Sequence, residues 1–151
     1  MLENMLSLNL QGKRVLDCGT GTGILGIMAH KLGATYINAY DTDSWSIENT
    51  NENLALNQVS GVDVWQGKIT DMEATEPFDI VLANINRNIL IAEMAQYAAV
   101  MAPNAQLLLS GFYKSDIELV ADAATKAGLT YVKEQSGFET WTVLHFEKSL
   151  K

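Results

Sequence analysis

A glycine-rich stretch near the start of the chain, VLDCGTGTGILG over residues 15–26, constrains the fold more than any other feature. Four glycines fall within eight residues, directly after a short apolar run. This pattern is typical of a buried strand that turns sharply into a helix, because glycine lets the backbone double back and lets a ligand approach the amino end of the helix. The stretch therefore predicts an α/β fold with a ligand site at this turn.

Two binding motifs fit these glycines. Gly21, Gly23 and Gly26 match the G-x-G-x-x-G of dinucleotide binders. Asp17 followed by Gly19, Gly21 and Gly23 matches the D-x-G-x-G-x-G of proteins that bind a methyl donor. A phosphate-binding P-loop is excluded, because no Lys-Ser or Lys-Thr follows the glycines at the required place. The glycines alone do not choose between the first two motifs.

Of two acidic residues near these glycines, one favours the methyl donor and the other is compatible with either ligand. Asp17 ends the first predicted strand, where a carboxylate would repel a pyrophosphate but suits S-adenosylmethionine, which carries an α-ammonium group and a sulfonium. Asp41 ends the next predicted strand, where it can accept hydrogen bonds from both ribose hydroxyls. Dinucleotide binders share this second acid, so only Asp17 separates the motifs. A purely structural role stays open for each acid: Asp17 bonding backbone amides of the turn, and Asp41 capping a helix.

The remaining sequence alternates short apolar runs with helix-patterned segments from Lys13 to about Gly128. This alternation predicts an α/β, Rossmann-like sheet, mostly parallel, with helices on both faces. After Gly128, segments 129–135 and 139–147 flank SGF and predict a C-terminal antiparallel hairpin, which completes seven strands. We expect the other strands near 13–18, 35–41, 62–66, 78–83 and 105–110, and helices near 23–33, 44–57, 87–101 and 115–127.

Several polar and aromatic residues near the strand ends have predicted places. Asp43 or Ser44 can cap the second helix, and Asn84 or Asn86 the third. The aromatic residues divide by position. Trp45 could pack near an adenine, and Phe112 and Tyr113 could line the entrance for the acceptor amine or simply pack at the strand end. Trp65 and Trp141 are expected to fill the core as strand residues.

Composition limits the other function classes. A chain of 151 residues that is 48% hydrophobic predicts one globular domain. The net charge of −8 argues against nucleic-acid binding and favours a basic partner, although its role could equally be to keep the protein in solution. A single cysteine, Cys18, an N-terminus without a signal pattern and the lack of a membrane-length apolar stretch predict a cytoplasmic protein with no membrane partner. His30 and His145 lie far apart, so we expect no metal site.

The sequence resembles class I methyltransferases, and more closely the ribosomal protein L-eleven methyltransferase family (PrmA). The first two matching segments, VLDCGTGTGILGIMAHKLGA and AYDTDSWSIENTNENLALNQV, are general to methyltransferases. FDIVLANINRNIL, LLLSGFY and ETWTVL extend the match over nearly the whole chain, and LANI followed later by LSG is the more family-specific pair. The resemblance implies S-adenosyl-L-methionine as cofactor and amino groups of a large-subunit ribosomal protein, in a lysine side chain or at the N-terminus, as acceptors.

The resemblance also implies roles for individual residues. Gly19 lines the methionine part of the cofactor, Asp41 holds the ribose, and Asn84 lies beside the reacting methyl group. Asn84 is therefore the catalytic candidate, since its amide oxygen can accept from the acceptor amine. Its plainer role as the cap of the following helix stays open. The candidate cofactor-binding residues are Asp17, Gly19, Thr20, Gly21, Gly23, Asp41, Lys68, Ile69 and Asn84.

This chain departs from the family pattern in two respects. Relatives carry an N-terminal substrate-docking domain and an FGTG-type cofactor segment just before the sheet, and residues 1–151 are expected to be the single methyltransferase domain without both. Lys68 stands where many methyltransferases place an acid near the adenine. Two alternatives therefore stay open: a cofactor-binding domain without activity, and a small-molecule or RNA methyltransferase. The NINR after the fourth strand, in place of Asn-Pro-Pro-Tyr, disfavours methylation of nucleic-acid bases.

Overall fold

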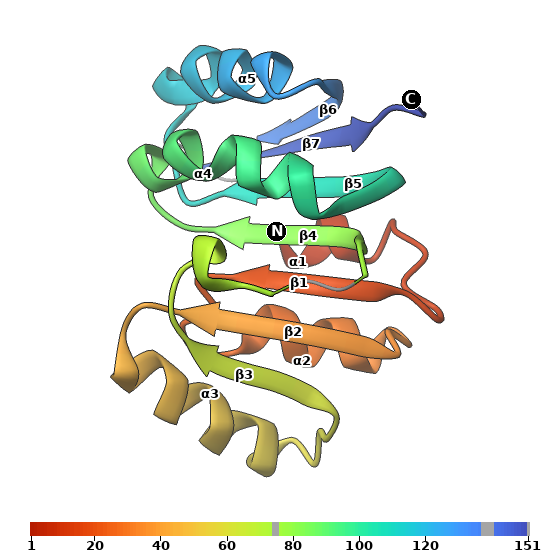
Figure 1. The fold of residues 1–151 in the computed structure, drawn as a ribbon, viewed down its shortest axis with the longest axis vertical. Coiled ribbons are helices and arrows are strands. Elements are labelled where there is room, and N and C mark those ends of the chain that lie inside the picture. The colour runs from red at the N-terminus through yellow and green to blue at the C-terminus, as the bar shows by residue number, and fades with distance from the viewer. Residues whose placement is uncertain (74–75, 137–140, 151) are drawn as a thin grey trace.

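The computed structural model describes residues 1–73, 76–136 and 141–150. Over these residues one seven-stranded sheet has the order β3-β2-β1-β4-β5-β7-β6. The five strands from β3 to β5 are parallel, so their carboxyl ends meet at one edge, whereas β7 runs antiparallel between β5 and β6 (Figure 1). The strands are β1 (Arg14–Cys18), β2 (Tyr36–Asp41), β3 (Val62–Gln66), β4 (Phe78–Asn84), β5 (Met101–Ser110), β6 (Leu129–Ser136) and β7 (Thr142–Lys148).

Helices cover both faces of this sheet (Figure 1). Side chains alternate along each strand, so Leu16 and Val81 face the core beneath α4 and α5, while Val15 and Leu82 face the core beneath α1 and α2. α3 packs beside α2 against β2 and β3. The helices are α1 (Leu2–Met5), α2 (Ile24–Lys31), α3 (Ser44–Leu56), α4 (Arg87–Val100) and α5 (Ile117–Lys126), with short 3₁₀ turns η1 (Ile69–Asp71) and η2 (Lys114–Asp116).

The predicted α/β fold and its C-terminal antiparallel strands are confirmed. The turn of the predicted hairpin falls on residues 137–140, which lie outside the described residues. β5 is longer than predicted: it starts at Met101, directly after α4. Its early half escapes sequence patterning because Asn104 has a positive φ of 61° and the pairing with β4 shifts register there. Within the described residues, no helix is long and apolar enough to cross a bilayer.

Candidate functional site

The turn between β1 and α2 needs glycine for two different reasons. Gly19, with φ of 67°, leaves no room for a side chain, because a Cβ there would overlap the side chain of Ile85. Gly21, with φ of 56°, has open space where a Cβ would lie. Gly23, also in the left-handed region at φ of 79°, is the N-cap of α2. The turn is therefore packed against the loop after β4 at Gly19 and leaves the backbone of Gly21 uncovered.

Asp17 lies fully buried beneath this turn. Its Oδ2 accepts hydrogen bonds from Thr20 Oγ1 at 2.9 Å and from the Gly26 amide at 3.1 Å. Its Oδ1 is buried with no partner among the described residues. Burial raises the pKa of this carboxyl to about 6, and the charge of Asp41 adds to the increase. The purely structural role open to Asp17 thus accounts for one carboxylate oxygen and leaves the other available to a donor.

Asp41 joins the end of β2 to the same turn. Its Oδ2 accepts from the Gly21 amide at 3.0 Å, and its Oδ1 accepts from the Asp43 amide at 3.0 Å. Asp43, rather than Asp41 or Ser44, caps α3, since its Oδ1 accepts from the Trp45 amide at 3.1 Å. Two carboxylates therefore flank the glycine turn, which favours a cationic ligand over a polyphosphate.

Lys68 and Ile69 lie at the same edge of the sheet, after β3. The Gly67 amide donates to the Asp41 carbonyl at 2.9 Å, which fixes this loop beside the acidic end of β2. Lys68 is exposed, whereas Ile69, the first residue of η1, has its side chain buried in the core. Both predicted residues therefore lie in the loop beside Asp41, and of the two only Lys68 has a side chain exposed to solvent.

Asn84 ends β4, and its register partner on β5 is Ser110. The alternative role for Asn84 is excluded by its neighbour, because Asn86 Oδ1 accepts from the amides of Asn88 at 2.9 Å and Ile89 at 3.4 Å and so caps α4. The Asn84 side chain is exposed at the strand edge. It is therefore free of the capping role and placed where ligands bind in open α/β sheets.

A pocket of about 490 Å³ surrounds Asn84. Its wall depends on Gly111, which has φ of 91° and comes so close to the main chain after β4 that a Cβ would lie 2.5 Å from the Ile85 oxygen. The Ile85 amide also donates to the Ser110 carbonyl at 3.2 Å. The LANI and LSG motifs thus meet in space. The residues that line this Asn84 pocket are Met1, Asn84, Ile85, Asn86, Ser110, Gly111 and Trp141.

Six of these seven lining residues, all except Asn84, were missing from the predicted site. Ser110 and Gly111 were detectable, because Ser110 ends β5 and Gly111 follows it, at the edge where the other predicted site residues gather. Trp141 was predicted in the core, and that prediction is wrong: its side chain is 51% exposed and its ring lies 5.0 Å from the ring of Tyr113. Trp141 precedes β7 and forms only an isolated bridge, so the strand alternation that buries β7 does not reach it.

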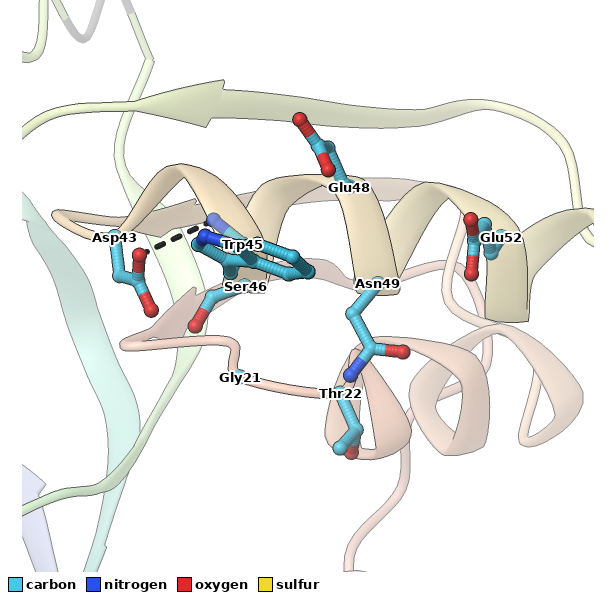
Figure 2. Close-up of a pocket in the computed structure, with 8 residues that line it drawn as sticks. All are labelled: Gly21, Thr22, Asp43, Trp45, Ser46, Glu48, Asn49 and Glu52. Carbon is cyan, nitrogen blue, oxygen red and sulfur yellow. Dashed lines mark hydrogen bonds between the residues drawn. The ribbon is translucent and has the colours of Figure 1, made fainter.

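The other two tryptophans have different surroundings. Trp65 packs against the core as predicted and donates from Nε1 to Asn38 Oδ1 at 2.7 Å. Trp45 is 76% exposed and lies along the first turn of α3, as Figure 2 shows. It lines a second pocket of about 490 Å³ between the glycine turn and α3, with Gly21, Thr22, Asp43, Ser46, Glu48, Asn49 and Glu52. Among the described residues, no three His, Cys, Asp or Glu side chains gather into a metal-binding group.

Sequence comparison places the chain among known proteins. The family model described as "Ribosomal protein L11 methyltransferase (PrmA)" matches residues 1–149. A ribosomal protein L11 methyltransferase from Porphyromonas gingivalis is 44% identical over 97% of this chain and 50% of its own length. The corresponding protein from Bacteroides fragilis is 42% identical over 97% of this chain and 52% of its own length. The chain thus spans about half the length of these curated relatives.

Solved structures agree with this placement. The crystal structure of a ribosomal protein L11 methylase from Lactobacillus delbrueckii subsp. bulgaricus superposes with a TM-score of 0.92, at 25% identity, over 99% of this chain and 77% of that one. A methyltransferase from Pyrococcus furiosus shares the fold with a TM-score of 0.84 at 16% identity, over 97% of this chain and 80% of that one. Because the family model matches residues 1–149 of the 151, the chain belongs to the ribosomal protein L11 methyltransferase family.

Proposed function

We propose that this chain transfers a methyl group from S-adenosylmethionine to an amino group of a large-subunit ribosomal protein. The observation that carries the proposal is the pair of carboxylates, Asp17 and Asp41, on either side of a glycine turn that adjoins the Asn84 pocket. Membership of the family supports methyl transfer, and the names of its relatives support the ribosomal acceptor. The chain's net charge of −8 suits a basic acceptor protein.

The residues of the turn fit the proposed cofactor. The unpartnered Oδ1 of Asp17 offers an acceptor for an ammonium group, and buried polar atoms rarely stay unpaired. Each Asp41 oxygen accepts one amide and retains a second lone pair, so ribose hydroxyls can bind without displacing Gly21. Gly19, Thr20 and Gly23 shape the turn, and we assign Lys68 and Ile69 to the adenine because the Gly67 amide holds their loop beside Asp41. When bound, the cofactor supplies an electrophilic methyl group on a cationic sulfur.

The Asn84 pocket fits the acceptor amine. A lysine amine with an ordinary pKa of about 10.4 arrives protonated, and nucleophilic attack requires its neutral form. The side chains that line the pocket are all uncharged, so no carboxylate there stabilises the ammonium form, and the loss of water when the acceptor binds would favour the neutral amine. The Asn84 amide oxygen then accepts one N–H of the amine and orients its lone pair. This bond is one part of the alignment of the two reactants, which as a whole is worth on the order of 7 kcal/mol.

The proposal extends to the organisation of the chain. We place residues 1–151 in a single methyltransferase domain, because one sheet takes in strands from β1 near the start to β7 near the end of the described residues. We place the reaction in the cytoplasm, where newly made ribosomal proteins are available as acceptors.

Two measurements test the proposal. Calorimetric titration should detect binding of S-adenosylmethionine and no binding of NAD. Binding of NAD alone would contradict the proposal. Transfer of tritium from labelled cofactor should then label purified ribosomal protein L11. Label in ribosomal RNA or in small amines instead would assign the chain to a different acceptor class, and binding without any transfer would leave it a cofactor-binding domain.

A further inference from the structure

A second, smaller groove adjoins the Asn84 pocket. Its volume is about 270 Å³, and it shares two lining residues, Asn86 and Gly111, with that pocket. It lies between the amino end of α4 and the segment from β5 to η2. We name it the flank groove; it is lined by Asn86, Arg87, Asn88, Gly111, Phe112, Tyr113 and Asp116.

An exposed aromatic pair connects the two hollows. Tyr113 lines the flank groove, Trp141 lines the Asn84 pocket, and their ring centroids are 5.0 Å apart. Both side chains remain about half exposed, at 53% and 51%. Phe112, by contrast, is buried in the core. Large exposed aromatic side chains gathered beside a pocket are typical of surfaces that bind another molecule.

The polar groups of the flank groove are balanced in charge. Arg87 Nη1 donates to Asp116 Oδ1 at 2.6 Å, and Arg87 Nε donates to Asn88 Oδ1 at 3.2 Å. The Asp116 side chain is only 13% exposed. Because Asp116 neutralises the guanidinium, the groove offers little attraction to a phosphate, whereas its amide and aromatic groups suit neutral peptide groups.

We propose that the flank groove binds the polypeptide segment next to the methylated residue, with Tyr113 packed against that segment. This inference rests on the proposed function. When the acceptor amine belongs to a protein, the polypeptide next to it must lie close to the Asn84 pocket. The flank groove is open to that polypeptide, because it shares Asn86 and Gly111 with the pocket. The groove therefore makes the site selective for an amine within a polypeptide over the same amine in a free amino acid.

Steady-state kinetics with two acceptors test this selectivity. Tyr113→Ala should raise KM for purified ribosomal protein L11 about tenfold, the effect of losing one aromatic contact, and leave kcat unchanged. KM for n-butylamine, which carries the reacting amine but no peptide group, should stay as in the parent protein. Tyr113→Phe should retain the parent KM. Tyr131→Ala is the matched control, because Tyr131 is similarly exposed, at 49%, but lies on β6.

Two results would overturn the inference: an unchanged KM for the protein acceptor in Tyr113→Ala, or an equal rise for both acceptors. If the parent protein transfers no methyl group, the proposed function fails, and calorimetric binding of ribosomal protein L11 with S-adenosylhomocysteine present decides the inference separately. Binding that is weakened by Tyr113→Ala and not by Tyr131→Ala supports the groove. Equal binding in both variants, or none in the parent, refutes it.

Discussion

The Gly21 amide donates a 3.0 Å hydrogen bond to Oδ2 of Asp41, which links the glycine turn after β1 to the end of β2. The second oxygen of the same carboxylate accepts from the Asp43 amide at the start of α3. One acidic side chain thus bonds both segments, in addition to the hydrogen bonds that Thr50 and Asn53 of α3 donate to carbonyls of the turn. Any ligand that bonds this carboxylate meets it already oriented.

Replacing Asp41 tests that role. Asp41→Asn keeps one acceptor oxygen but loses the charge and one acceptor, so two charge-assisted bonds to ribose hydroxyls weaken. We expect affinity for S-adenosylmethionine to fall about tenfold to a hundredfold, measured by calorimetry. Asp63→Asn, at an exposed acid on β3, is the control and should bind as the parent does. Equal affinity in the two variants would count against Asp41 as a ligand.

The buried carboxyl of Asp17 should make stability depend on pH. Its pKa rises from 3.8 to about 6 in the folded protein, mainly through burial. The folded state therefore binds the proton more tightly than the unfolded state does. The stability from this group is fully present below pH 3.8 and is lost as the pH rises through about 6. At pH 7 the loss is about 3 kcal/mol.

Urea unfolding across that window checks this sign. The free energy of unfolding of the parent protein should fall between pH 4 and pH 6.5, and Asp17→Asn should reduce that slope, because an amide does not titrate. The cofactor responds in the opposite direction: since a cation favours the ionised carboxylate, affinity for S-adenosylmethionine should weaken as the pH falls below about 6. Parallel pH curves for the two proteins would refute the shifted pKa.

Asn84 and Asn86, two residues apart, allow the effect on catalysis to be measured separately from the effect on stability. Asn86→Ala removes the cap of α4 and should lower the free energy of unfolding by about 1 kcal/mol. Asn84→Ala removes no cap and should leave that free energy near the parent value, while kcat for methyl transfer falls about a hundredfold through lost orientation of the amine. Urea denaturation and single-turnover transfer measure the two effects. A stability loss in Asn84→Ala as large as in Asn86→Ala would contradict the assignment.

The placement of the candidate residues at one edge of the sheet was predictable from sequence where they follow strand periodicity. Asp17, Asp41 and Asn84 all end apolar runs, and parallel strands bring such ends to one edge, so their gathering required no tertiary information. Trp141 was not predictable in this way, because it lies just before β7 and forms only an isolated bridge with Tyr113, so the alternation of the strand does not extend to it. The choice between Asn84 and Asn86 as helix cap also had to await the structure, since both fit the pattern.

The approach of Gly111 to Ile85 is a further contact that no local pattern reveals. A Cβ at Gly111 would lie 2.5 Å from the Ile85 oxygen and 2.8 Å from its nitrogen, both main-chain atoms that cannot rotate away. Gly111→Ala should therefore separate the loops that form the Asn84 pocket and lower the free energy of unfolding by about 3 kcal/mol, from overlap added to the cost of φ 91°.

Gly128→Ala isolates the conformational part of that cost. Gly128 has a similar φ of 83°, but nothing lies within 4 Å of where its Cβ would be. This variant should lose only about 1 kcal/mol, the left-handed penalty alone. Urea denaturation of both variants gives the difference, which measures the overlap with Ile85. Equal losses would mean that the loops after β4 and β5 yield freely, and the Asn84 pocket would then lack the rigid wall that orienting an amine requires.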